Sequence, residues 1–378
     1  MASINKIRCE FPVTQDYIYL DHAASAPLPK RVLDASNRVN EEKYYGDIFW
    51  DKWEALVEDT RKTIARFINA HSDEIALIPN TSEGISIVAN GITWKKGDNI
   101  VTSNSEFPSN LIPWQVQAMK HKVQIRIVKA GLNGELNIED FADKIDEKTK
   151  VVAISHVQYS NGFRTNLREL SNLTHSKNAY LVTDAVQSVG QMIVDVKNLG
   201  VDFLATSGYK WLLSPVATGF LFVKKDLIEK IGLSIVGYRS AEKMQDFSFR
   251  NFNPAKTARR FEHGHLNFSG FAGMNESIRM LEGVNMRKIE RRIFNLTDQI
   301  IDNIKEMKNL EIDSCLLPDH RSGIIKLKCK KPEKVNGMLR RKGVVISVRD
   351  KGLRISPHFY NTSEEIEKFL TLLHKEVL

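Results

Sequence analysis

Between residues 73 and 223 the chain alternates short apolar runs with segments whose apolar residues recur at helical spacing. The seven apolar runs are residues 75–79, 99–103, 123–128, 151–155, 179–183, 203–206 and 219–223. Helical spacing is found at residues 83–93, 110–120, 138–145 and 167–176. This alternation predicts an α/β fold with a doubly wound, mainly parallel sheet and helices on both faces. Because the apolar runs are uninterrupted, we expect the strands to be buried on both sides.

The length of 378 residues predicts more than one domain, because single cores stop growing at roughly 250–300 residues. A long helical stretch over residues 270–307 precedes a region in which short strands and helices alternate. We therefore expect a large domain over residues 21–285 and a small α+β domain over residues 286–378. An N-terminal segment, residues 1–20, is expected to pack with the small domain.

Composition describes an ordinary globular protein with a formal net charge of +8. Lysines and arginines are spread over the whole chain and mixed with acidic residues, so we expect no nucleic-acid partner. The 3 cysteines form no CxxC pair, which argues against a zinc site and suits a reducing, cytoplasmic location. The first residues lack the apolar core of a signal peptide, and we expect no membrane association and no bound metal.

Two polar groups stand where predicted strands end. Asp184 directly follows the run 179–183, and Lys210 follows the run 203–206 by a few residues. Ligands of an open parallel sheet bind outside the carboxyl ends of its strands, so this acid and this amine are expected to face one crevice. Lysine for a Schiff base and a carboxylate for the pyridine nitrogen are what pyridoxal phosphate (PLP) requires. The alternative is an ordinary exposed lysine and an aspartate that caps a helix.

Further residues fit the same cofactor. The stretch 80–84 joins a strand to a helix, where backbone N–H groups and hydroxyls form an anion site, although the same pattern also serves as a simple helix cap. Ser207 is a second candidate for the phosphate. Gln187, one turn beyond Asp184, is a candidate donor to the phenolate oxygen of the ring. Aromatic neighbours of Lys210, including Tyr209, are expected to desolvate its amine and lower the pKa.

Longer motifs make the pattern specific. They are residues 19–29 (YLDHAASAPLP), 80–84 (NTSEG), 106–114 (EFPSNLIPW), 155–164 (SHVQYSNGFR), 183–188 (TDAVQS), 207–212 (SGYKWL), 260–267 (RFEHGHLN) and 354–362 (RISPHFYNT). Through nearly its whole length the chain resembles the class V aminotransferase family of fold-type I PLP-dependent enzymes. That family includes cysteine desulfurases, isopenicillin N epimerase-like proteins and kynureninase. The resemblance implies a large PLP-binding domain with a mainly parallel seven-stranded sheet and a smaller C-terminal α+β domain.

The resemblance also implies roles for single residues. Lys210 would carry the Schiff base, Asp184 would bind the pyridine nitrogen and Gln187 the phenolate oxygen. The residues implied for the phosphate are Thr81, Ser82 and Ser207, together with Gly264 and His265 of the other subunit of a homodimer with shared active sites. Arg354 corresponds to the arginine that clamps the α-carboxylate of the substrate, a task that suits its planar fork. A surface salt bridge is the alternative for Arg354.

Three positions depart from the desulfurase pattern. The position that stacks on the cofactor ring is Phe107, where desulfurases have histidine, and Tyr209 stands where they tend to have histidine before the lysine. The stretch 343–354 contains no cysteine, so the cysteine-bearing loop of desulfurases is expected to be absent. Cys329, which falls in a strand-like run, is expected to be a core residue.

These comparisons predict a PLP-dependent enzyme that acts on an amino acid through an external aldimine and a carbanion. Transamination, epimerisation and β-elimination by a C–S lyase share these first steps and stay open. His22 and Tyr159 are further candidates for contact with the substrate. A cysteine desulfurase is the alternative activity, and a non-catalytic binding module that keeps the fold is the alternative of another class.

Overall fold

The computed structural model describes residues 4–245, 251–307 and 309–377. Its centre is a seven-stranded sheet in the order β2-β8-β7-β6-β5-β3-β4. The strands are β2 (Ile75–Ile78), β3 (Asn99–Ser103), β4 (Gln124–Val128), β5 (Thr149–Ser155), β6 (Tyr180–Asp184), β7 (Phe203–Ser207) and β8 (Gly219–Val223). All seven predicted strands are therefore present, which confirms the α/β fold class.

The sheet is mixed, with most strands parallel. β6 pairs in parallel with β5 and β7, and β3 pairs in parallel with β4 and β5. β8 runs antiparallel to both β7 and β2. The expectation that every strand is buried on both sides is wrong for β4, whose residues are mostly half-buried or exposed. β4 is an edge strand, with a neighbour on one side only.

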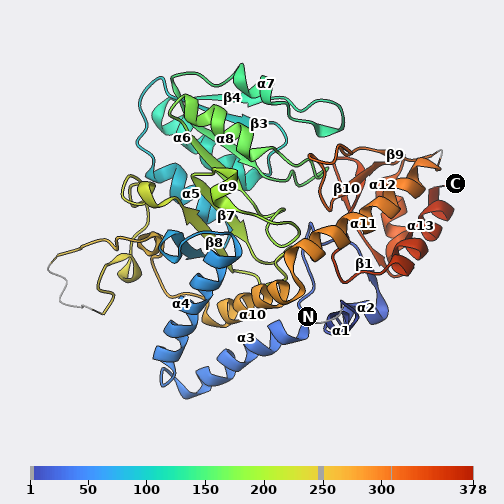
Figure 1. The fold of residues 1–378 in the computed structure, drawn as a ribbon, viewed down its shortest axis with the longest axis horizontal. Coiled ribbons are helices and arrows are strands. Elements are labelled where there is room, and N and C mark those ends of the chain that lie inside the picture. The colour runs from blue at the N-terminus through green and yellow to red at the C-terminus, as the bar shows by residue number, and fades with distance from the viewer. Residues whose placement is uncertain (1–3, 246–250, 308, 378) are drawn as a thin grey trace.

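Helices cover both faces of the sheet (Figure 1). Those that connect its strands are α5 (Thr81–Gly91), α6 (Ile112–His121), α7 (Ile138–Ala142), α8 (Leu167–Ser176) and α9 (Val196–Leu199). Two helices before the sheet, α3 (Lys30–Glu42) and α4 (Trp50–Phe67), pack on α10 (Phe268–Val284). The C-terminal end of α3 and the N-terminal end of α4 project beyond the body of the molecule (Figure 1).

The C-terminal part forms a second, smaller sheet in the order β12-β13-β10-β9. Its strands are β9 (Glu311–Ile312), β10 (Ile325–Lys328), β12 (Ser347–Arg349) and β13 (Gly352–Ile355). It packs with helices α11 (Met286–Lys305), α12 (Pro332–Arg341) and α13 (Ser363–Val377). The predicted long helix is in fact two, because Asn285 has a φ of +86° and ends α10 before α11 begins.

The N-terminal segment lies against this smaller sheet and its helices. It contains α1 (Ile4–Arg8), α2 (Val13–Asp16) and β1 (Ile18–Tyr19), and β1 pairs in parallel with β11 (Val344–Val345). Arg8 forms a salt bridge with Glu365 of α13, with 2.7 Å between nitrogen and oxygen. The domain boundaries given above stay a prediction.

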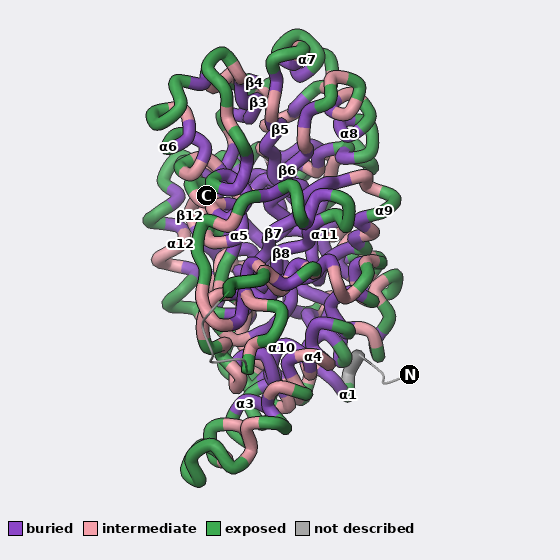
Figure 2. The backbone as a smooth tube through the Cα atoms, turned by 90° about the vertical axis from the view of Figure 1, so that its left-hand side faces the viewer, coloured by how far each residue is buried: buried purple, intermediate pink, exposed green. Residues whose placement is uncertain are grey.

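Burial follows this architecture, with the central strands buried and the outer helix faces exposed (Figure 2). Two apolar clusters flank the large sheet, and a third lies between the small sheet and its helices. Within the described ranges, no helix combines the length and apolar character that a membrane span requires.

Gly190 lies against the backbone of Trp211, next to Lys210, and provides a test of how tightly this region is packed. Its φ is +104°, and an added Cβ would lie 2.3 Å from the carbonyl oxygen of Trp211. Gly97 also has a positive φ, +96°, but an added Cβ there would meet nothing within 4 Å. Replacing Gly97 by Ala should cost roughly 1–2 kcal/mol of unfolding free energy from backbone strain alone. Replacing Gly190 by Ala should cost about 1–3 kcal/mol more because the backbone at Trp211 must shift.

Urea unfolding of the two variants measures this difference. Equal losses in Gly97→Ala and Gly190→Ala would contradict the close approach between Gly190 and Trp211.

Candidate active site

The acid and the amine predicted from the sequence lie at the ends of neighbouring strands. Asp184 is the last residue of β6 and pairs in register with Ala205 of β7, and Lys210 follows the end of β7 by three residues. Both side chains are buried, with exposed fractions of 2% for Asp184 and 7% for Lys210. The alternative of an exposed lysine is therefore wrong.

Burial shifts the ionisation of both groups. Loss of water raises the pKa of Asp184, and the amine of Lys210 partly offsets this shift. Loss of water likewise lowers the pKa of Lys210, against the attraction of Asp184. Asp184 accepts a hydrogen bond from the backbone N–H of Val186 at 2.9 Å through Oδ1. Among the described residues no donor bonds to Oδ2.

Gln187 is held between two segments of the site. Its Nε2 donates to the carbonyl of Ala23 at 2.9 Å, and its Oε1 accepts from the indole N–H of Trp211 at 2.8 Å. The second hydrogen of Nε2 remains for another acceptor. Through Trp211, Gln187 also fixes the chain next to Lys210.

The candidate phosphate contacts gather at the first turn of α5. The backbone N–H of Thr81 donates to Ser207 Oγ at 2.9 Å, and the two hydroxyls lie 3.0 Å apart. Ser82 donates to Ser109 through its hydroxyl at 2.8 Å. Asn80 caps the helix by accepting from the N–H of Glu83 at 3.0 Å. The cap predicted for 80–84 is thus present, and the helix N-terminus adds partial positive charge for an anion.

Two aromatic rings lie near the amine. Lys210 Nζ is 5.7 Å from the ring centre of Phe107 and 5.6 Å from that of Tyr209. Phe107 is 41% exposed and meets Tyr159 edge to face, with ring centres 5.2 Å apart. Burial and the charge of Asp184 raise the pKa of Tyr209, which keeps its hydroxyl protonated at neutral pH.

Arg354 of β13 reaches the same region from the small sheet. Its Nη1 donates to the carbonyl of Tyr159 at 2.8 Å, and its Nη2 donates to Asp21 Oδ1 at 3.2 Å. Only 1% of Arg354 is exposed, and its Nε is buried without a hydrogen-bond partner. Burial lowers the pKa of Arg354 and raises that of Asp21. The alternative of a surface salt bridge is therefore wrong, because the ion pair with Asp21 is buried and the guanidinium retains free N–H groups.

His22 is turned toward the interior. Its Nδ1 lies 2.8 Å from the carbonyl oxygen of Ser356, and its Nε2 lies 2.7 Å from the hydroxyl of Tyr360. The side chain is fully buried, and burial lowers its pKa well below the ordinary value. No ring nitrogen is left for a substrate, so His22 braces the two parts of the chain in this structure.

Gly264 and His265 lie near the molecular surface. His265 is exposed, with Nδ1 2.7 Å from the hydroxyl of Tyr238 and its ring edge to face with Trp50. An added Cβ at Gly264 would meet nothing within 4 Å. His263 Nδ1 lies 3.9 Å from Glu83 of α5, which places this segment beside the candidate phosphate cradle of its own chain. Its contact with a second subunit stays a prediction.

Comparison with known proteins identifies the family. The model of the class V aminotransferase family matches residues 18–369. The chain belongs to this family of PLP-dependent enzymes.

Its relatives are named as desulfurases. A probable cysteine desulfurase of Methanothermobacter thermautotrophicus is 31% identical over 96% of this chain and 95% of its own length. The solved apo structure of a cysteine desulfurase from Thermococcus onnurineus has a TM-score of 0.91 at 28% identity, covering 100% of this chain and 98% of that one. A cystine C–S lyase in complex with cysteine persulfide has a TM-score of 0.90 at 20% identity, covering 96% and 99%, and shows the shared fold alone. This chain is a cysteine desulfurase-like class V enzyme with the fold-type I architecture.

Sequence reasoning missed one buried carboxylate near the candidate site, Glu106, whose charge helps to raise the pKa of Asp184. Glu106 accepts hydrogen bonds from Ser103, Asn110, Ser155 and Gln158 at distances of 2.6–3.1 Å. These donors come from the end of β3, from the end of β5 and the residues after it, and from the turn before α6, so Glu106 ties together the segments on either side of Phe107. The only sequence signal for a role of Glu106 was its position in the motif EFPSNLIPW.

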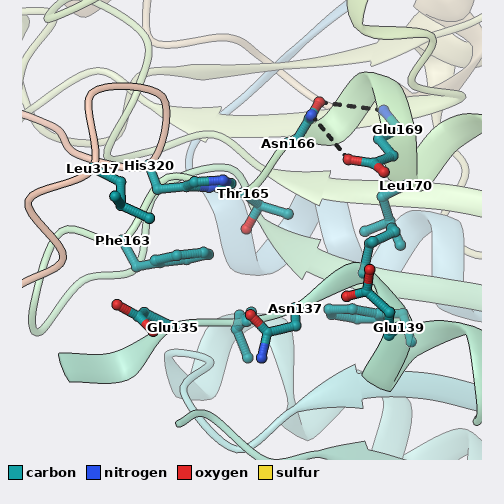
Figure 3. Close-up of a pocket in the computed structure, with 13 residues that line it drawn as sticks. Glu135, Asn137, Glu139, Phe163, Thr165, Asn166, Glu169, Leu170, Leu317 and His320 are labelled. Carbon is teal, nitrogen blue, oxygen red and sulfur yellow. Dashed lines mark hydrogen bonds between the residues drawn. The ribbon is translucent and has the colours of Figure 1, made fainter. Parts of the chain in front are cut away.

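A separate cavity of about 270 Å³ lies away from the candidate active-site residues. It is found where the loop at residues 317–320 meets the start of α8 (Figure 3). The rings of Phe163 and His320 stack there at 5.2 Å. The N–H of Arg164 donates to the carbonyl of His320 at 2.8 Å. This cavity is lined by no candidate site residue and lies between α7, α8 and the loop at residues 317–320.

The electrostatic link between Lys210 and Asp184 is testable in cofactor-free protein. Asp184 raises the pKa of Lys210, so Asp184→Asn should lower that pKa and leave more neutral amine at a given pH. Reductive methylation with formaldehyde, followed by peptide mass spectrometry, gives the pH midpoint of labelling at Lys210. The midpoint should move to lower pH in Asp184→Asn, while the exposed Lys120 keeps its profile. A shift to higher pH at Lys210 would contradict the link.

Proposed function

We propose that this class V enzyme binds PLP covalently through Lys210 and acts on the α-amino group of an amino acid. The observation that carries the proposal is the buried pair of Asp184 and Lys210 at neighbouring strand ends. An unneutralised amine and acid are costly to bury unless both have partners, and the cofactor supplies a partner for each.

The residues present fit this cofactor. Oδ2 of Asp184 remains for the protonated pyridine nitrogen, and the remaining Nε2 hydrogen of Gln187 for the phenolate oxygen. Thr81, Ser82 and Ser207 would hold the phosphate, and Phe107 would cover the ring. The bound cofactor withdraws electrons from the α-carbon of the substrate, which makes the α-proton acidic.

The chain's own residues then bind the substrate and move its proton. Arg354 would hold the α-carboxylate through its free N–H groups, close to Tyr159. Nζ of Lys210 would accept the α-proton, because burial lowers its pKa and favours the neutral amine. Phe107 can stack on a ring but has no group that transfers a proton, so proton transfer falls to Lys210 and Tyr209.

We further propose a homodimer in which Gly264 and His265 of one subunit reach the phosphate of the other. His265 is exposed and Gly264 is half-buried, so a second subunit can reach this segment, which supports the arrangement. The cytoplasmic location expected from the cysteines stays a prediction.

The reaction at the α-carbon is proposed to need no protein thiol. In support, β12 and β13 pair at Arg349 and Gly352, so only Asp350 and Lys351 separate the two strands. A turn of this length has no room for a mobile loop. β-Elimination of a sulfur substituent, transamination and epimerisation all proceed without a cysteine. The second candidate is a cysteine desulfurase, which the names of the relatives favour.

The cofactor proposal predicts a yellow protein. Borohydride treatment should fix a pyridoxyl group on Lys210, found by peptide mass spectrometry, and Lys210→Ala should lose both the fixed group and the activity. Protein that stays colourless after addition of PLP would favour the non-catalytic binding module instead.

The cysteine variants separate the two candidate functions. If the enzyme is a lyase, sulfide release from cysteine should be unchanged in Cys315→Ala and Cys329→Ala but absent in Lys210→Ala. Cys315 is buried, and burial raises the pKa of its thiol, which keeps it protonated. The desulfurase would be established if replacing a single cysteine abolished persulfide formation while Lys210 still carried the cofactor as a Schiff base.

A further inference from the structure

Arg349 is held at the site by a tight hairpin. It ends β12 and pairs with Gly352, the first residue of β13. The two residues between them, Asp350 and Lys351, have φ angles of +45° and +61°. Two central residues with positive φ form the turn that matches the twist of paired strands, so the direction of Arg349 is fixed by the backbone.

Arg349 and Arg354 leave the same face of this hairpin. Ser347 pairs with Arg354, and Arg349 lies two residues beyond Ser347 on the same strand. Side chains alternate along a strand, so Ser347, Arg349 and Arg354 share one face, while Leu353 packs into the apolar cluster on the other. The residue opposite Arg349 is Gly352, which has no side chain to obstruct it.

Arg349 forms no ion pair with any residue that the structure describes. Its hydrogen bond is from Nη1 to the carbonyl of Val348 at 2.7 Å, and no carboxylate of the described residues lies within 4.0 Å of it. The neighbouring cations on the same face are paired: Arg354 with Asp21 at 3.2 Å and Lys326 with Asp313 at 3.0 Å. The charge of Arg349 helps to lower the pKa of Asp21, but that carboxylate is bonded to Arg354 and not to Arg349. A half-buried guanidinium without a directly bonded counter-ion is costly, so this position favours an anion from outside the chain.

The charge of Arg349 acts on the proposed substrate contacts. This positive charge favours a lower pKa at each of three groups: Lys210, Arg354 and Tyr159. Arg349 shares one face of the hairpin with Arg354, so its charge acts on the arginine that would hold the α-carboxylate and on the amine that would meet the α-carbon.

We propose that Arg349 binds a second acid group, carried on the side chain of the substrate. The substrate class is then an amino acid with a side-chain carboxylate or comparable oxyacid. Arg354 holds the α-carboxylate, Lys210 faces the α-carbon and Arg349 receives the distal group. The inference rests on the proposed function for its orientation of the substrate. The competing arrangement places both arginines on one α-carboxylate.

Two simple ligands separate these arrangements. Succinate carries two carboxylates and propionate carries one, and neither has an amine, so neither reacts with the cofactor. Isothermal titration of the enzyme as purified with its cofactor measures both affinities. We expect succinate to bind more tightly than propionate to the wild-type enzyme. Arg349→Gln should weaken succinate about tenfold or more and leave propionate unchanged, because one charged hydrogen-bonding partner is lost.

Two further variants serve as controls. Arg354→Gln should weaken both ligands, since each presents a carboxylate to that arginine. Lys351→Gln removes an exposed positive charge from the adjacent turn and should leave both affinities unchanged, which excludes a general effect of charge. Circular dichroism of each variant checks that the fold is kept.

Equal weakening of succinate and propionate in Arg349→Gln would overturn the proposal and assign Arg349 to the α-carboxylate. Equal affinities in the wild-type enzyme would overturn it as well. The proposed function fails in a different way, through absence of a borohydride-fixed pyridoxyl group on Lys210, because ligand binding at the two arginines does not depend on the Schiff base.

Discussion

The burial of an acid and an amine together at the end of two parallel strands is the constraint on which the rest of this site depends. β6 and β7 bring Asp184 and Lys210 to the same edge of the sheet, and the surrounding core removes water from both. Low solvation makes each charge dependent on a partner. Gln187 and Trp211 hold the backbone around the pair through one side-chain hydrogen bond of 2.8 Å. The candidate phosphate contacts at the first turn of α5, the ring of Phe107 and the guanidinium of Arg354 are arranged around this fixed pair.

Local sequence patterns were sufficient to predict the large sheet and the functional residues at its strand ends. The seven apolar runs predicted the large sheet, and the carboxyl ends of its strands located Asp184 and Lys210. Exposure of β4 was not predicted, because an edge strand differs from a central one only in its neighbours. The end of α10 at Asn285 was also missed, because apolar spacing continues across it.

Contacts between distant segments could not be read from the sequence. Arg354 and Asp21 are 333 positions apart, and nothing local to either indicates their ion pair. His22 was a candidate for substrate contact, but its ring is bonded to Ser356 and Tyr360 in the interior. Glu106 acts through four donors from separate segments, so its role emerges only when β3 and β5 are placed side by side. The sequence thus predicted which residues gather, but not how their hydrogen bonds are shared.

The central claim is that Asp184 and Lys210 are the two ends of one PLP site. A crystal structure of the protein with added PLP tests it most directly. We expect electron density continuous from Lys210 Nζ into the cofactor, with the pyridine nitrogen within hydrogen-bond distance of Asp184 and the phosphate at the first turn of α5. Cofactor density at another lysine, or a ring whose nitrogen faces away from Asp184, would contradict it.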